Sequence, residues 1–128
     1  MTITSARDLV RAANAAVRTV SGEEAAKLVR EPGTVLVDLR EQEELARSGV
    51  AEGAVHVPRG LLEFQADPAS PSHRAELSPD ATLVLYCGSG ARSALAAETL
   101  GRMGFSKVAH VAGGFAELER AGVPIRRA

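Results

Sequence analysis

Residues 82–103 read TLVLYCGSGARSALAAETLGRM, and they contain a strand, a tight loop and a helix in succession. The apolar run over 82–86 is typical of a strand that is buried on both faces of a sheet. Over 93–103 the apolar residues recur at helical spacing, and Gly104 follows as a C-terminal stop. A buried strand that leads into a helix is typical of sheets whose strands run parallel.

The same alternation continues on both sides of this stretch. Strands are expected at 34–39, 54–57 and 107–111. Helices are expected at 1–20, 21–30, 41–47, 93–103 and 115–121, with one helical turn at 60–65. We therefore predict an α/β domain with a mostly parallel sheet covered by helices on both faces, and a ligand site at the carboxyl ends of its strands.

Composition limits the possible functions. The 128 residues are 45% hydrophobic and 24% charged, as in ordinary globular domains, and we expect a single domain over 1–128. No apolar run approaches the roughly 20 residues of a membrane span, and the net charge of −1 gives no basic field for nucleic acid. We expect neither a membrane nor a nucleic-acid partner. Residues 1–20 fit an amphipathic helix capped by Ser5 better than a targeting sequence, which favours a cytoplasmic location.

Cys87 is the one cysteine of the sequence. A single cysteine excludes an internal disulfide, a CxxC redox pair and a cysteine-rich zinc site. The three histidines are scattered and have no carboxylates clustered around them. We therefore expect no metal and no other cofactor.

The loop after Cys87 has the features of an anion site. Gly88 and Gly90 can take positive φ, so the loop can curl and turn successive backbone N–H groups inward. The start of the next helix adds further N–H groups, and Arg92 adds a full positive charge. These features favour a thiolate over a thiol. We predict that Cys87 is a nucleophile, although a lone buried cysteine is more often an inert core residue.

The segment CGSGARS at 87–93 resembles the active-site loop of the rhodanese family in its small, single-domain form. Other segments resemble further landmarks of that family in the same order: VLVDLRE at 35–41, GAVHVP at 53–58 and GGF at 113–115. The resemblance covers about 35–118. It implies a three-layer rhodanese-like fold with a central, mostly parallel five-stranded sheet. Val50 and Leu118 stand where many members have a histidine and an aromatic residue, and these changes are expected to alter packing.

The resemblance implies a sulfurtransferase in which Cys87 takes a sulfane sulfur from thiosulfate or another donor and holds it as a persulfide. Cyanide, a thiol or an acceptor protein then removes that sulfur. Because the sequence has no second cysteine, the acceptor must be external. Arg92 would bind the donor or orient the loop. The residues expected to bind the persulfide through their N–H groups are Gly88, Ser89, Gly90, Ala91, Arg92 and Ser93.

Several other side chains could belong to the site. Arg59 follows a strand end and could face an anionic donor or could be a solvated loop charge, and both interpretations stay open. Asp38 and Arg40 are expected to form a pair that ties strand to loop. The remaining candidates are His56 and His110, expected to be hydrogen-bonded strand residues; His73, expected to be exposed; and Leu61, Leu62 and Phe64, which could line the site or pack on the sheet.

Two other functions are compatible with the sequence. Cysteine phosphatases and arsenate reductases also place an anion-binding loop and an arginine after the nucleophile, but five residues separate the two, against four here. Asp67 and Asp80 are the candidates for the general acid of such an enzyme. The other alternative is a non-catalytic rhodanese-like binding module, in which the cysteine is commonly lost.

Overall fold

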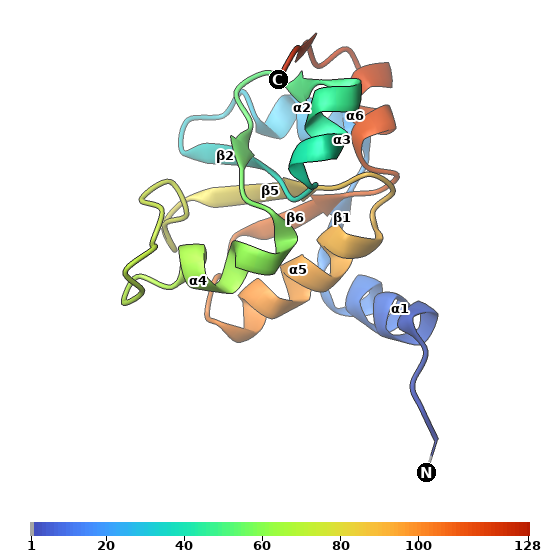
Figure 1. The fold of residues 1–128 in the computed structure, drawn as a ribbon, viewed down its shortest axis with the longest axis vertical. Coiled ribbons are helices and arrows are strands. Elements are labelled where there is room, and N and C mark those ends of the chain that lie inside the picture. The colour runs from blue at the N-terminus through green and yellow to red at the C-terminus, as the bar shows by residue number, and fades with distance from the viewer. Residues whose placement is uncertain (1) are drawn as a thin grey trace.

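A computed structural model describes residues 2–128 and is shown in Figure 1. Its central layer is a five-stranded sheet in the order β1-β6-β5-β2-β4, and all four neighbouring pairs are parallel. The predicted mostly parallel five-stranded sheet is therefore confirmed. Its strands are β1 (Arg18–Val20), β2 (Thr34–Asp38), β4 (Val55–His56), β5 (Thr82–Tyr86) and β6 (Val108–Val111).

Helices cover both faces of this sheet. In Figure 1, α1, α4 and α5 lie on one side, and α2, α3 and α6 lie on the other. No helix formed by residues 2–128 combines the length and hydrophobicity needed to cross a membrane. The helices are α1 (Ala6–Ala16), α2 (Gly22–Leu28), α3 (Gln42–Ser48), the 3-10 turn η1 (Arg59–Leu61), α4 (Leu62–Ala66), α5 (Ala91–Arg102) and α6 (Phe115–Arg120).

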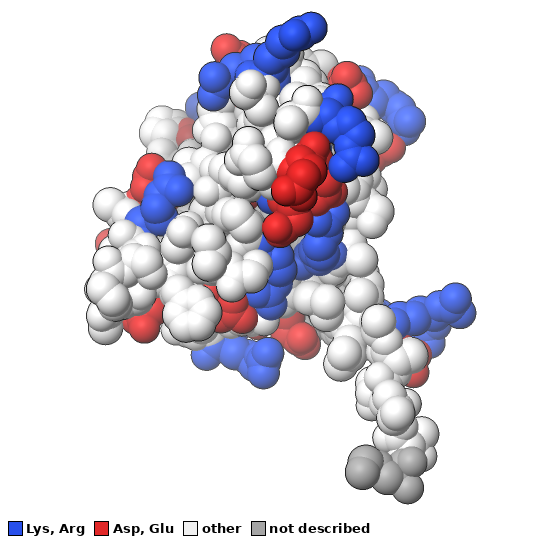
Figure 2. All heavy atoms as spheres, in the orientation of Figure 1, with Lys and Arg blue, Asp and Glu red and all other residues white. Residues whose placement is uncertain are grey.

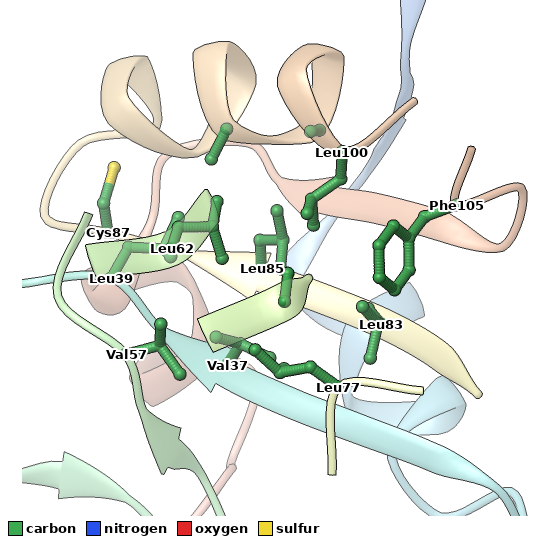
Figure 3. Packing of buried hydrophobic residues seen from close by; sticks show 13 residues of the cluster. Val37, Leu39, Val57, Leu62, Leu77, Leu83, Leu85, Cys87, Leu100 and Phe105 are labelled. Carbon is green, nitrogen blue, oxygen red and sulfur yellow. The ribbon is translucent and has the colours of Figure 1, made fainter. Parts of the chain in front are cut away.

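Alternate residues of the strands point into two separate cores. Leu83 and Leu85 of β5 pack in one core against α4 and α5, whereas Val84 and Tyr86 pack in the other against α2 and α6. Figure 3 shows the first core, in which Leu100 of α5 and Phe105 close over the sheet. This two-sided burial explains the continuous apolar run of β5, because a strand with a polar face could not be covered by helices on both sides.

The predicted helix over 1–20 is wrong at its C-terminal end. It begins as expected, since the Ser5 hydroxyl accepts a hydrogen bond from the Asp8 N–H at 3.0 Å. It ends at Ala16, and residues 18–20 form the edge strand β1 beside β6. Val20 is buried against the sheet, and pairing with β6 satisfies its backbone. β-Branched residues fit that position well, so tertiary pairing prevails over the helical spacing.

Two further differences concern short segments. Helix α5 begins at Ala91, two residues before the predicted start at Ser93. An antiparallel pair was not predicted, β3 (Val50–Ala51) with β7 (Ile125–Arg126). Each of these strands has two residues, which is too short to produce a periodic pattern.

Charges of both signs are distributed over the surface. On the face seen in Figure 2, acidic and basic side chains lie beside one another at several places. This arrangement agrees with the formal net charge of −1.

Candidate active site

Cys87 lies at the carboxyl end of the central strand β5, where the chain turns into α5. The residue is fully buried and belongs to the core that contains Leu39, Val57 and Leu62. Figure 3 shows its sulfur at the end of this core, directed toward the loop that leads into α5. An apolar wall thus supports the thiol on one side, and the polar loop lies on the other.

Two backbone N–H groups of the loop point at the sulfur. Gly90 N lies 3.1 Å and Ser93 N lies 3.4 Å from Cys87 Sγ. The other four N–H groups of the predicted set, from Gly88, Ser89, Ala91 and Arg92, make no hydrogen bond to the sulfur. The geometry of two donors converging on one sulfur stabilises negative charge there.

Gly90 makes the turn possible. Its φ of 105° lies in the left-handed region, and it is the N-terminal cap of α5. Gly88 does not take positive φ, contrary to the expectation for this position. A Cβ at Gly88 would lie 3.1 Å from the guanidinium of Arg92, so the absence of a side chain there leaves room for Arg92.

Glu44 binds Arg92 with both carboxylate oxygens. Arg92 Nη1 lies 2.8 Å from Glu44 Oε2, and Nη2 lies 2.8 Å from Oε1. The hydrogen bonds from Arg92 lower the pKa of Glu44 to about 2, and the same contact raises the pKa of Arg92. Of the two roles expected for Arg92, this bidentate geometry fits orientation of the loop.

Sequence reasoning missed Glu44, which is 48 residues from Arg92. It lies in the first turn of α3, just after the carboxyl end of β2, and its Oε2 accepts the Glu41 N–H at 2.8 Å. This reciprocal cap has a pattern in the sequence from which Glu44 could have been found. Glu41 and Glu44 stand three residues apart after a buried strand, and β2 is the neighbour of β5.

Asp38 and Arg40 form the predicted pair that ties strand to loop. Both are buried, and Arg40 Nη2 lies 2.7 Å from Asp38 Oδ2. Tyr86 donates its hydroxyl to the same oxygen at 2.6 Å, and burial raises the pKa of this phenol. Arg40 also donates to the Gly49 carbonyl at 2.8 Å. The pair therefore joins β2 to the segment after α3 and anchors the region from which Glu44 projects.

Arg59 is bound to two other side chains. Its guanidinium donates to Glu63 at 3.0 Å and to Thr99 of α5 at 3.4 Å. Of its apolar neighbours, Leu62 is buried in the core that contains Cys87, whereas Leu61 and Phe64 are exposed. The structure therefore brings Leu62, but neither Leu61 nor Phe64, into the packing around Cys87.

The three histidines all make hydrogen bonds. His56 Nε2 lies 2.7 Å from the Arg40 carbonyl, and buried His110 contacts Ser93 and Asn14, as expected for hydrogen-bonded strand residues. His73 is half-buried and its Nδ1 lies 3.1 Å from the Gln65 carbonyl, so the expectation that it is exposed is wrong. It fastens the 67–73 loop back onto α4.

A family model for the rhodanese-like domain matches residues 21–121, which include the whole Cys87 loop. The chain belongs to the rhodanese-like family. A sulfurtransferase from Allochromatium vinosum is 34% identical to it over 91 residues, which are 71% of this chain and 77% of that protein.

Solved structures resemble this rhodanese-like chain over nearly its full length. The polysulfide-sulfur transferase homodimer of Wolinella succinogenes superposes with a TM-score of 0.75 at 30% identity, covering 93% of this chain and 85% of that one. A Rhodopseudomonas palustris protein of unknown function, described as a possible tyrosine phosphatase, superposes with a TM-score of 0.90 at 38% identity, covering 98% of both chains.

This rhodanese-like sequence differs from the expected family pattern at Val50 and Leu118, and both residues are packed. Val50 is in β3 and is 8% exposed, and Leu118 of α6 is fully buried. Leu118 packs in the core that also holds Val84 and Tyr86, on the face opposite Cys87. Both substitutions therefore concern packing, as the sequence predicted.

Proposed function

We propose that this rhodanese-like chain is a sulfurtransferase that carries a sulfane sulfur as a persulfide on Cys87. The observation that carries the proposal is the convergence of the Gly90 and Ser93 N–H groups on Cys87 Sγ. Family membership supports it, as do the sulfurtransferase and polysulfide-sulfur transferase among the similar proteins.

The reaction proceeds in two displacements. With thiosulfate as donor, the Cys87 thiolate attacks the sulfane sulfur, a new S–S bond forms, and the old S–S bond breaks to release sulfite. Cyanide or an external thiolate then attacks the outer sulfur, which releases thiocyanate or a new persulfide and restores the Cys87 thiolate. The loop N–H groups stabilise the negative charge on sulfur at each stage.

Each residue of the proposed site has a separate task. Cys87 is the catalytic nucleophile, and the N–H groups of 88–93 bind the persulfide, two of them already at the inner sulfur. Arg92, held by Glu44, fixes the first turn of α5 and thereby the direction of those N–H groups. Arg59 is bound to Glu63 and Thr99, so a role in donor binding requires it to leave them.

A cysteine phosphatase is the second candidate, because the Rhodopseudomonas protein carries that tentative description. Four features of the site weigh against it. Four residues separate Cys87 from Arg92, and the Arg92 guanidinium is bound by Glu44. Asp80 precedes β5 and so lies at the end of that strand opposite Cys87. Asp67 accepts the Ala69 N–H at 2.8 Å in its own turn.

Mass spectrometry of the intact protein tests the proposal. After incubation with thiosulfate, the wild type should gain the mass of one sulfur atom, and cyanide should remove it as thiocyanate. Cys87→Ser should do neither. A wild type that gains no sulfur from thiosulfate or polysulfide contradicts the proposal. Hydrolysis of a phosphate ester by the wild type alone would then support the phosphatase, and no reaction at all would support a binding module.

A further inference from the structure

A continuous chain of hydrogen-bonding groups leads from the nucleophile to a buried histidine. Cys87 Sγ lies 3.7 Å from Ser93 Oγ, which lies 2.9 Å from His110 Nδ1. These groups come from the end of β5, the first turn of α5 and β6. His110 pairs with Leu85 across the sheet, so its ring reaches Ser93 from the neighbouring strand.

The partners of the imidazole set the direction of this chain. Nε2 lies 2.8 Å from Asn14 Oδ1, an acceptor, and 3.1 Å from the Thr19 hydroxyl, and donation from Nε2 to Asn14 leaves Nδ1 with a free lone pair. The Ser93 hydroxyl can then donate to Nδ1, and its oxygen can accept from the thiol. The Gly90 carbonyl is the other possible acceptor for Ser93, at the longer distance of 3.2 Å.

The surroundings of His110 keep it available as a base. Its contacts from α1, β1 and α5 are uncharged, namely Asn14, Thr19 and Ser93, and Cys87 is the ionisable group that it faces through Ser93. The charged residues of the site, Arg92 and Glu44, form an ion pair with each other. Burial lowers the pKa of His110 below its ordinary value of 6.5, so the ring is neutral at pH 7.

We propose that His110 accepts the thiol proton of Cys87 through Ser93. As the sulfur attacks an electrophile, the thiol proton moves to Ser93 Oγ and the Ser93 hydroxyl proton moves to His110 Nδ1. The electron pair of the S–H bond becomes the attacking pair, and the leaving group departs with the pair of its own broken bond. His110 thereby acts as a positioning residue that works through Ser93, and the reverse transfer restores the thiol after sulfur has left.

A pocket on the far side of the ring gives this proton a route to solvent. Asn14, Thr19 and His110 line a pocket of about 270 Å³ together with Ser89 and Gly90 of the active-site loop. His110 itself is only 2% exposed. When Cys87 is alkylated and no thiolate remains to take the proton back, exchange with water at this pocket returns the histidine to its neutral form.

Alkylation of Cys87 by iodoacetamide between about pH 6 and pH 10 tests the transfer. The wild-type rate should be nearly flat from about pH 6.5 to 8. His110→Asn keeps an acceptor near Ser93 but cannot take a proton, so its rate should rise steadily with pH over this range instead of staying flat. The variant should therefore be at least about tenfold slower than the wild type at pH 7 and should equal it at pH 10.

Ser93→Ala supplies a second variant that retains the backbone N–H at the sulfur, and it should show the same profile as His110→Asn. His73→Asn, in the distant 67–73 loop, is the matched control and should behave as the wild type. A flat profile in His110→Asn, or an equal loss at every pH including pH 10, overturns the proposal, since either result assigns His110 a structural role.

The proposal uses the sulfur-transfer function for its natural electrophile, yet alkylation requires no sulfur transfer. The two ideas therefore fail separately. A wild type with the flat profile that takes up no sulfur contradicts the proposed function alone. A wild type that takes up sulfur while His110→Asn keeps its alkylation profile contradicts the proton transfer alone.

Discussion

Arg92 and Glu44 meet face to face at the start of α5, each using two atoms. The Arg92 side chain is 38% exposed and that of Glu44 is 27% exposed, so the pair is partly shielded from water. Because the pair links α3 to the active-site loop, its contribution is expected in the geometry of the N–H donors at Cys87. If the Arg92 guanidinium bound the sulfur donor directly, it would instead contribute to activity through its positive charge.

The two roles of Arg92 are separated by a double-mutant cycle. Arg92→Ala and Glu44→Ala should each lower the kcat/KM for thiocyanate formation by roughly tenfold, the scale of a lost charge-assisted hydrogen bond. The double variant should be no slower than Arg92→Ala, because both changes break one interaction. Arg92→Ala that is far slower than Glu44→Ala, with additive losses in the double variant, would assign Arg92 to the donor.

At the scale of elements, the turn between β6 and α6 supports the active-site loop. Phe115 N donates to the Cys87 carbonyl at 2.9 Å, and Gly114 lies directly against the carbonyls of Cys87 and Gly88. A Cβ at Gly114 would collide with both oxygens, which are backbone atoms of the loop. Only glycine therefore fits at position 114, because any side chain there would push the Cys87 loop away from this turn.

Gly114→Ala should destabilise the fold by about 2–4 kcal/mol, because it adds overpacking to backbone strain at a φ of 69°. Gly53→Ala is the matched control. It has a φ of 83° and open space around its Cβ, so it should cost only about 1 kcal/mol. Urea unfolding measures both values. Equal losses in the two variants would show that Gly114 is required for its backbone conformation alone.

At the scale of the whole molecule, the strand order brings the groups of the proposed site together at the carboxyl ends of the central strands. β2 and β5 are neighbours, as are β5 and β6, so Glu44, Cys87 and His110 come together from separate elements. Two of these groups have lower pKa values in the folded chain than the ordinary values of their residue types. Protons are therefore taken up on unfolding in acid, and the stability of the whole fold depends on pH.

Stability should fall in two steps as the pH is lowered. The unfolded chain binds a proton at His110 from about pH 6.5, where the buried native ring is still neutral, so stability decreases below that pH. The Glu44 contribution is complete above about pH 4.5 and is lost toward its folded pKa of about 2. Urea unfolding from pH 8 to pH 3 should show both steps. His110→Asn should remove the first and Glu44→Gln the second, and unchanged curves would contradict these assignments.

The sequence by itself determined the features that depend on neighbours along the chain. The strand over 82–86, the N-terminal cap at Ser5, the turn at Gly90 and the Asp38–Arg40 pair all follow from periodicity, caps or contacts within a few residues. Spacing around Cys87 was enough to predict the tight loop and the helix that follows it, because a loop and a helix start are local structures.

Only the tertiary structure decided which distant groups meet. It makes residues 18–20 a strand and pairs β3 with β7. It also brings Glu44 to Arg92 and His110 to Ser93, within hydrogen-bond distance. Apart from the β3–β7 pair, which forms a sheet of its own, these contacts depend on the order of strands in the central sheet. Backbone pairing and burial across that sheet outweigh the small local preferences that a sequence pattern reports, so residues far apart in the chain acquire their roles only when the sheet has formed.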